Sequence, residues 1–123
     1  MNKETTSCRR PKPLLAERPL LTFAESDDVA NLFKILSNPT RLRILHALAR
    51  KQELCVIELA AMVDMKAQAV SNQLQRLVDR KMLTCRREGT YSYYRIADSC
   101  VSELLDSGIC LLEDTKLPCG PSC

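Results

Sequence analysis

The segment KAQAVSNQLQRLVDRK, residues 66–81, constrains the fold more than any other part of the chain. Its apolar residues recur at intervals of three and four, which is typical of an amphipathic helix with one buried face. A shorter apolar-periodic segment, LCVIELAAMV at 54–63, precedes it and is separated from it only by Asp64-Met65. Two short helices joined by a tight turn predict a helix-turn-helix.

The other faces of the 66–81 helix carry amide, hydroxyl and basic side chains. Asn and Gln can hydrogen-bond to adenine edges in the major groove, whereas Lys and Arg hold phosphates or guanine. We therefore expect this helix to contact double-stranded DNA. The predicted contacts are Lys66, Gln68, Ser71, Asn72, Gln73 and Arg76.

A β-hairpin is predicted directly after this helix. Residues 82–87 and 91–96 favour strands, and Glu88-Gly89-Thr90 between them favours a turn. A hairpin in this position is a wing. Its basic residues Arg86 and Arg87 are expected to contact the DNA backbone or minor groove, which adds affinity without reading sequence.

Three more helices complete the predicted fold. Thr22 and Glu25 form a capping-box pattern for a helix over 23–36, Asn38-Pro39 opens the next helix, and Asp98 or Ser99 caps a last helix. The fold class is thus mainly α with a small β-hairpin: a winged helix-turn-helix of four helices, hairpin and final helix. The expected organisation is a flexible arm at 1–21, one DNA-binding and dimerisation domain at 22–114, and a Cys-containing tail at 115–123.

The first and last helices have more apolar surface than a small winged domain can bury. Gly108, inside the last helix, costs about 1 kcal/mol relative to Ala, which makes sense where a partner helix packs closely. An ordinary imperfect helix is the alternative. We predict a homodimer, which places two reading helices about one DNA turn apart and requires a near-palindromic operator.

The charge distribution agrees with a nucleic-acid partner. The net charge of +3 divides into +1 over residues 1–39, +6 over 40–95 and −4 over 96–123. No apolar run approaches the roughly 18 residues that cross a bilayer, and the start lacks the apolar core of a secretory signal. We therefore expect a cytoplasmic protein with no membrane partner.

Seven cysteines are the main compositional oddity. An odd number cannot pair completely, and thiols in a reducing compartment are more often ligands or redox groups than structural disulfides. Thiolates prefer soft ions such as cadmium, lead, mercury, copper(I) and arsenite. Cys119 and Cys123 lie in LPCGPSC, a Pro/Gly tail unsuited to a regular core, which favours a ligand or redox role for them.

Four segments in register carry a family resemblance: NLFKILSNPTRLRILHAL, ELCVIELA, VSNQLQRLVDRKML and RREGTYSYYRI. Together they resemble the ArsR/SmtB family of bacterial winged-helix repressors, over about residues 28–112. The resemblance implies a homodimer that represses an operon for metal efflux, sequestration or detoxification. It also implies that the operator is released when a metal or metalloid binds.

The resemblance further suggests where an inducer binds. ELC at 53–55 is similar to the start of the ELCVCDL motif of cadmium/lead and arsenic sensors, so Cys55 matches a ligand position, whereas Ile57 and Ala60 replace further cysteines. The arm of one sensor type implies Cys8, and the tail LLEDTKLPC, similar to another type, implies Cys119. Cadmium, lead and arsenite are the expected inducers, with zinc as an alternative. The candidate ligands are Cys55, Cys119, Cys123, Cys8, Cys100 and Cys110.

The sequence leaves three alternative functions to compare with repression. Cys110 paired with Cys100 or Cys119 would make the same fold a redox or reactive-sulfur sensor. An enzyme with a cysteine nucleophile has little support, because the lone His46 has no glycine-lined pocket in the sequence around it. A protein-interaction module with an idle winged domain would fail to bind the DNA upstream of its own gene.

Overall fold

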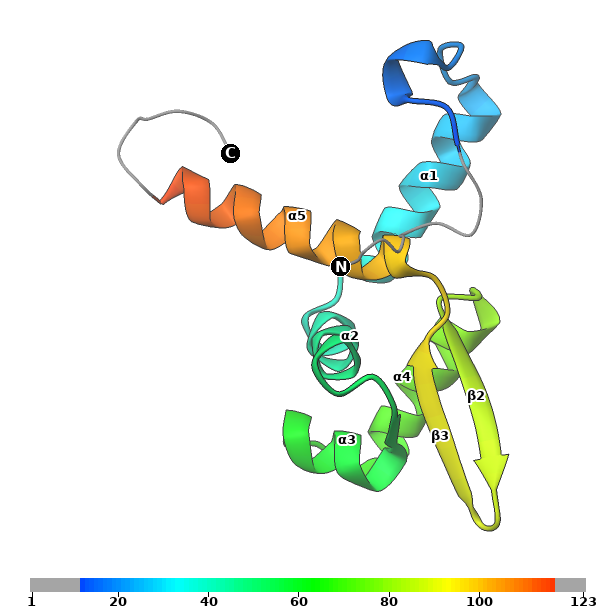
Figure 1. The fold of residues 1–123 in the computed structure, drawn as a ribbon, viewed down its shortest axis with the longest axis vertical. Helices are drawn as coiled ribbons and strands as arrows, with labels where there is room; N and C mark the ends of the chain where they lie inside the picture. Colours follow the sequence, from blue (N-terminus) through cyan, green and yellow to red (C-terminus); the bar gives the residue numbers. More distant parts are fainter. Residues whose placement is uncertain (1–11, 117–123) are drawn as a thin grey trace.

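The computed structural model describes residues 12–116 and contains six helices and three strands over that range (Figure 1). A wing follows the helix-turn-helix pair, as predicted. The elements in chain order are the 3-10 turn η1 (Leu15–Glu17), α1 (Phe23–Leu36), α2 (Pro39–Lys51), β1 (Leu54–Cys55), α3 (Val56–Val63), α4 (Ala67–Asp79), β2 (Leu83–Glu88), β3 (Tyr91–Ile96) and α5 (Ser99–Thr115).

Side-chain caps begin the helices where the sequence predicted. In α1 the Glu25 N–H donates to Thr22 Oγ1 at 3.1 Å, and the Thr22 N–H donates to Glu25 Oε1 at 2.9 Å. The Asp98 carboxylate accepts from the Cys100 N–H at 2.8 Å and caps α5. These bonds satisfy backbone donors that the first turn of a helix leaves unpaired. The predicted helix over 23–36 is confirmed at both ends.

The turn between α3 and α4 depends on one residue with a left-handed backbone. Asp64 has φ 56° and ψ 54°, a conformation that Asp tolerates better than most residues. Directly after it, the Met65 N–H donates to the Ala60 carbonyl at 3.0 Å. The turn is therefore short and closed, and the predicted helix-turn-helix is confirmed.

The small sheet has one strand more than predicted. The strand order is β1-β3-β2, and both pairings are antiparallel. The prediction that residues 54–63 are all helical is wrong at its start, because Leu54 and Cys55 pair with Tyr94 and Tyr93 of β3 before α3 begins. The wing is thus joined along one edge to the segment that leads into α3.

The hydrophobic core belongs to the middle of the chain. Side chains from α2, α3, α4 and β2 are almost fully buried, whereas α1 and α5 bury no residue completely. Figure 1 shows α1 and α5 extending away from the body that the other elements form. The largest buried side chains are Ile44, Leu45, Leu48, Leu59, Val70, Leu74, Leu77 and Leu83.

The N-terminal segment is more structured than the arm predicted for residues 1–21. Within the described part of that arm, η1 forms one turn of 3-10 helix, yet every residue over 12–30 is exposed. Leu20 and Phe23 are 94% and 88% exposed. The apolar side chains of residues 12–30 are therefore not buried by the described residues of one chain.

A candidate DNA interface and a candidate thiol site

Helix α4 divides into a buried face and a hydrogen-bonding face. Val70, Leu74 and Leu77 are fully buried against the core. On the opposite face, Gln68 Nε2 donates to Asn72 Oδ1 at 3.1 Å, and both residues are exposed. Among the other predicted DNA contacts, Lys66 and Arg76 are exposed and Ser71 is half-buried.

One predicted DNA contact on α4 has a different position. Gln73 is half-buried, and its Oε1 accepts from Arg41 Nε of α2 at 2.7 Å. The same guanidinium donates through Nη1 to the Ile35 carbonyl in the last turn of α1, at 3.0 Å. Gln73 therefore holds α4 against α2 and the end of α1, rather than lying on the exposed face with Asn72.

Gln75 is a residue of the exposed α4 face that sequence reasoning missed. Its Nε2 donates to Asp79 Oδ1 at 2.9 Å, and both side chains are exposed. Gln75 lies seven residues after Gln68 and three after Asn72, so helical periodicity could have found it.

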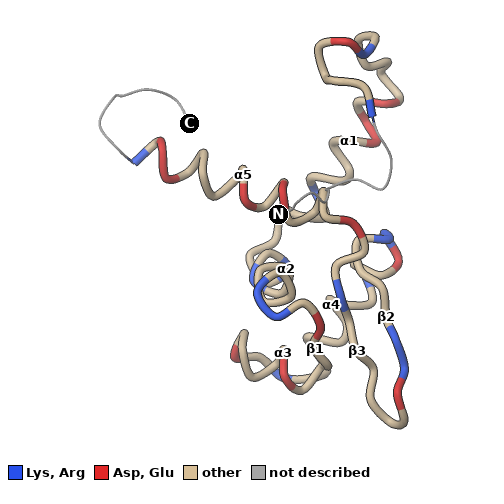
Figure 2. The backbone as a smooth tube through the Cα atoms, viewed as in Figure 1, with Lys and Arg blue, Asp and Glu red and all other residues tan. Residues whose placement is uncertain are grey.

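The wing carries basic residues on both of its faces. Cross-strand pairing places Arg86 opposite Tyr93 and Arg87 opposite Ser92. Because successive side chains of a strand point to opposite faces, Arg87 shares the face of the buried Leu83, and Arg86 lies on the other face. Figure 2 shows basic residues throughout the body and acidic ones along α5, in agreement with the charge division of the sequence.

Arg86, predicted to contact DNA, is already engaged within the protein. Its Nε and Nη2 donate to the two carboxylate oxygens of Glu53, at 3.1 and 2.8 Å. It also forms an ion pair with Glu88, and its guanidinium carbon lies 4.9 Å from the centre of the Tyr93 ring. The hydrogen bond from Arg86 holds the pKa of Glu53 below its usual value, and Glu53 raises the pKa of Arg86 in turn.

Cys55 is the one buried free thiol of the described chain, with 8% of the residue exposed. It precedes the first residue of α3, and its N–H donates to Glu58 Oε1 at 2.9 Å. Hydrogen bonds from Cys55 lower the pKa of Glu58. Burial, together with the nearby Cys55 and acidic groups, raises the pKa of Tyr93. The thiol is thus held at the junction of β1 and α3, beside a carboxylate and a tyrosine.

The other predicted ligands are dispersed. Cys110 is half-buried on α5 with its Sγ 4.0 Å from Asp114 Oδ2, and Cys100 is disulfide-bonded. Within residues 12–116, no three His, Cys, Asp or Glu side chains are grouped to hold a metal ion. Cys8, Cys119 and Cys123 lie outside the described residues. One chain's described residues therefore do not complete the predicted thiolate site.

The predicted pairing of Cys110 with Cys100 does not occur within this chain. Cys110 is a free thiol. Both residues belong to α5, where ten positions correspond to about 15 Å along the helix axis. A disulfide requires Cα atoms within about 7 Å. The two cysteines of one chain therefore cannot bridge while α5 remains a helix.

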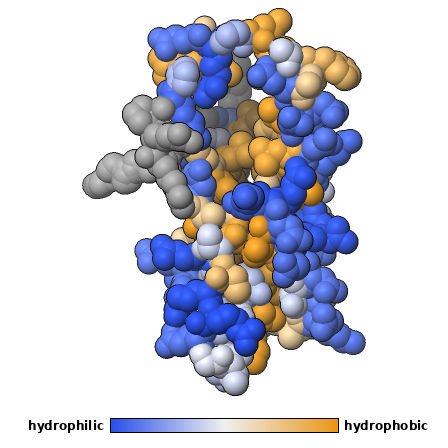
Figure 3. Space-filling view, turned by 90° about the vertical axis from the view of Figure 1, so that its right-hand side faces the viewer, coloured by the Kyte–Doolittle hydropathy of each residue, from blue (hydrophilic) through white to orange (hydrophobic). Residues whose placement is uncertain are grey.

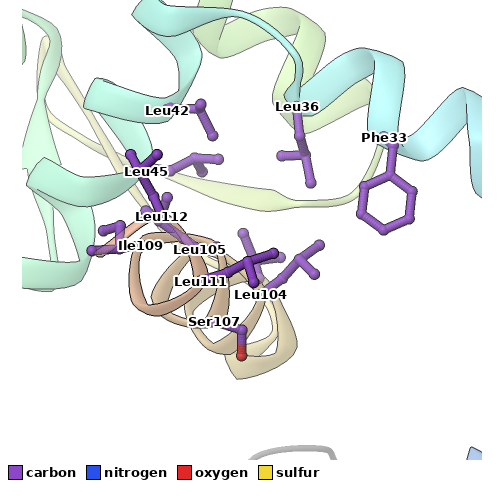
Figure 4. A pocket seen from close by; sticks show the side chains of 12 residues that line it. Phe33, Leu36, Leu42, Leu45, Leu104, Leu105, Ser107, Ile109, Leu111 and Leu112 are labelled. Carbon is purple, nitrogen blue, oxygen red and sulfur yellow. The ribbon is translucent and has the colours of Figure 1, made fainter. Parts of the chain in front are cut away.

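A long apolar groove lies between α1, α2 and α5 (Figure 4). Its volume is about 540 Å³, and a Cβ added at Gly108 on its edge would meet no atom within 4 Å. Figure 3 shows apolar side chains gathered along the middle of one face, between hydrophilic margins. Residues lining the groove include Phe33, Leu36, Leu42, Leu45, Leu105, Ile109 and Leu112.

Comparison with known proteins gives a consistent family. The sequence model described as "Bacterial regulatory protein, arsR family" matches residues 38–81. A transcriptional repressor SmtB homolog of Synechocystis is 34% identical, over 82% of this chain and 86% of the relative. The cadmium resistance transcriptional regulatory protein CadC of Listeria innocua is 31% identical, over 90% and 92%.

Solved structures agree in fold. The crystal structure of the AntR antimony-specific transcriptional repressor is 56% identical with a TM-score of 0.75, covering 85% of this chain and 95% of that one. The solution structure of the homodimeric winged helix-turn-helix DNA-binding domain Mb0332 of Mycobacterium bovis is 34% identical with a TM-score of 0.67, covering 81% and 92%.

The described residues and the related proteins share one fold, a winged helix-turn-helix. Over residues 12–116, no helix has the length and apolar character needed to span a membrane. The described chain presents a polar reading helix beside a basic wing, in the arrangement of winged DNA-binding proteins. The chain belongs to the ArsR family of bacterial winged helix-turn-helix transcriptional regulators, which are DNA-binding proteins and not enzymes.

Proposed function

We propose that this chain is a homodimeric repressor that releases its operator when a thiophilic metalloid or metal ion binds cysteine thiolates. Trivalent antimony is the first candidate inducer, followed by arsenite, cadmium and lead. The observation that carries this choice is the 56% identity to an antimony-specific repressor over 85% of the chain. Relatives described as cadmium and arsenical resistance regulators widen the choice to soft ions in general.

Operator recognition falls to the exposed face of α4 and to the wing. Amide side chains on this face can bond base edges in the major groove, while Lys66, Arg76 and Arg87 can hold phosphates. Gln73 and Arg86 position these elements. The proposed contacts are Lys66, Gln68, Ser71, Asn72, Gln75, Arg76 and Arg87.

Dimerisation supplies the cover that α1 and α5 lack. Phe33, Leu111 and Leu112 are 50%, 65% and 55% exposed in one chain. Exposed apolar patches of this kind mark protein contact sites. A homodimeric relative with 34% identity supports two-fold pairing, and the open space over Gly108 suits the close approach of a partner helix.

The inducer site is built around Cys55. Its thiol is buried beside the start of α3, and soft ions prefer thiolate ligands. Cys8, Cys119 and Cys123 supply further thiolates in this proposal, and Cys110 is available from α5. The thiolate is the form that coordinates a metal ion, so binding of the ion is expected to release the thiol proton.

Release follows from linkage between the two sites. An ion that binds the DNA-free geometry more tightly than the DNA-bound geometry weakens operator binding by the same factor. A shift from nearly full to nearly empty promoters requires about a 10⁴-fold difference in affinity. Thiolate coordination across several chain segments can supply a difference of that size.

The test combines DNA binding with spectroscopy. Anaerobic, reduced protein is titrated onto labelled DNA from upstream of its own gene, and fluorescence anisotropy follows release by antimony(III), arsenite, cadmium, lead or zinc. Ultraviolet sulfur-to-metal charge-transfer absorption reports coordination on the same samples. The Cys55→Ser variant should keep its metal-free operator affinity within about threefold and lose most of the ion-driven release.

Two results would contradict this proposal. Normal antimony(III) response in Cys55→Ser would remove Cys55 from the site. Release by an oxidant or persulfide alone, with no effect of any ion, would instead establish the redox or reactive-sulfur function. Serine variants of Cys8 and Cys119, together with deletion of residues 117–123, then identify the remaining ligands.

A further inference from the structure

One row of side chains crosses the whole sheet on the face opposite the core. Cys55 of β1 pairs with Tyr93 of β3, and Tyr93 pairs with Arg86 of β2. Directly paired residues point to the same face, with Cβ atoms about 5 Å apart. The buried thiol and the wing arginine are therefore separated by one tyrosine side chain, and we call these three residues the cross-strand row.

Glu53 links the two ends of this row, because it lies close to Cys55 in sequence and hydrogen-bonds to Arg86. It lies two residues before Cys55, and its carboxylate accepts two hydrogen bonds from Arg86, at 3.1 and 2.8 Å. Paired Arg–carboxylate bonds of this kind fix orientation as well as distance. The Arg86 guanidinium also lies over the Tyr93 ring, with 4.9 Å to its centre. The wing is thus fastened to the residues around Cys55 by a directional contact.

We propose that the Glu53–Arg86 pair couples Cys55 to the wing, so that a change at the thiol alters how the hairpin meets DNA. Arg86 is then a positioning residue that orients the wing for Arg87, rather than a phosphate contact itself. This inference rests on the proposed function for the identity of the inducer and for contact of the wing with the operator. The coupling itself concerns residues of the described chain.

Glu88 provides a matched control within the same cluster. It also pairs with Arg86, yet it belongs to β2, the strand that carries Arg86. Loss of the Glu88 pair keeps the side-chain link between Arg86 and the segment before β1, whereas loss of the Glu53 pair removes that link and leaves only the backbone pairing of β1 with β3. Glu53→Gln and Glu88→Gln each remove one negative charge that pairs with Arg86. Comparing the two variants therefore separates the proposed coupling from a general change in the electrostatics of the wing.

The first experiment needs no metal. Cys55 is 8% exposed, so its alkylation by N-ethylmaleimide requires local opening. If opening at Cys55 is coupled to the wing, operator DNA must slow alkylation, because linkage is reciprocal. Peptide mass spectrometry should show Cys55 alkylation slowed about tenfold by DNA in the wild type and in Glu88→Gln, and less than twofold in Glu53→Gln.

The second experiment uses antimony(III) potassium tartrate as the ligand. Fluorescence anisotropy measures operator affinity with and without the ion, and charge-transfer absorption measures the affinity for the ion. Glu53→Gln should bind the ion within threefold of the wild type, while the fold-loss of operator affinity caused by the ion should be at least tenfold smaller. Glu88→Gln should behave as the wild type.

The outcomes distinguish the coupling from the inducer assignment. The coupling would be overturned if Glu53→Gln and Glu88→Gln behaved alike. It would also be overturned if DNA protected Cys55 equally in the wild type and in Glu53→Gln, since direct coverage by DNA would then explain the protection. Absence of DNA protection in the wild type would overturn it as well. Glu53-dependent protection without any response to antimony(III) would support the coupling and contradict the inducer assignment.

Discussion

The body of the molecule and its two outer helices differ in how their apolar residues are buried. Elements α2 to β3 enclose a continuous core, in which Ile44, Leu59 and Leu74 are fully buried. Helices α1 and α5 have comparable amphipathic patterns and bury no residue completely. The body therefore has its main stabilising contacts within one chain, whereas the outer helices pack on it with only part of their apolar surface, and the proposed dimer would cover the rest.

A substitution in the body should have the largest effect. Leu74→Ala removes a fully buried side chain between α4 and the core, which costs about 2–5 kcal/mol in the free energy of unfolding. Urea denaturation followed by circular dichroism measures this loss. Phe23→Ala, at an 88% exposed position of α1, serves as the control and should change the unfolding of the body little. Comparable losses in both variants would contradict an independent body core.

A charge on the outer helices should separate the chains without unfolding them. Leu112 is 55% exposed at the groove of α5, so Leu112→Glu costs one chain little and buries an unpaired carboxylate in a dimer. Sedimentation should show the dimer dissociation constant raised at least a hundredfold. Operator affinity should fall accordingly, because the predicted near-palindromic operator requires two reading helices.

Helical circular dichroism provides the control for that experiment, since the Leu112→Glu monomer should retain the spectrum of a folded body. A variant that remains dimeric would show that the chains pair through another surface. A variant that unfolds would show that the body depends on pairing for its own stability.

The smallest expected effect is that of Gly108→Ala, which should stabilise one chain but weaken the pairing of two chains. In one chain, Gly108→Ala should stabilise α5 by up to about 1 kcal/mol, because Ala has the higher helix propensity and its Cβ has open space. In a dimer with a partner helix packed over Gly108, the same methyl group should weaken pairing. Sedimentation at several concentrations measures the second effect, and unchanged or tighter pairing would place the partner helix elsewhere.

Local patterns predicted the helices and the hairpin closely. The bounds of α1 at 23–36 follow from a capping box whose two residues are three positions apart, so the signal and its consequence lie together in the sequence. The turn before α4 and the Gly89 turn of the wing are similarly local. These features depend on contacts that a short window of sequence contains.

Features made by distant partners were missed. Strand β1 has only two residues and exists because β3 pairs with it from about forty residues away. Gln73 and Arg86 stay predicted DNA contacts, but the sequence did not show that Arg41 and Glu53 hydrogen-bond to them from 32 and 33 residues away. Side-chain chemistry identified both as hydrogen-bonding groups, and only the three-dimensional structure identifies what they bond.

The open groove between α1, α2 and α5 has a consequence for how much of this protein a cell must hold. If only dimers bind the operator, operator occupancy rises with the square of the subunit concentration when the protein is scarce. Halving the rate of protein synthesis then lowers operator occupancy by more than half. Under the proposed function, gene dosage and dilution at cell division would then change promoter occupancy, in addition to the proposed inducing ion.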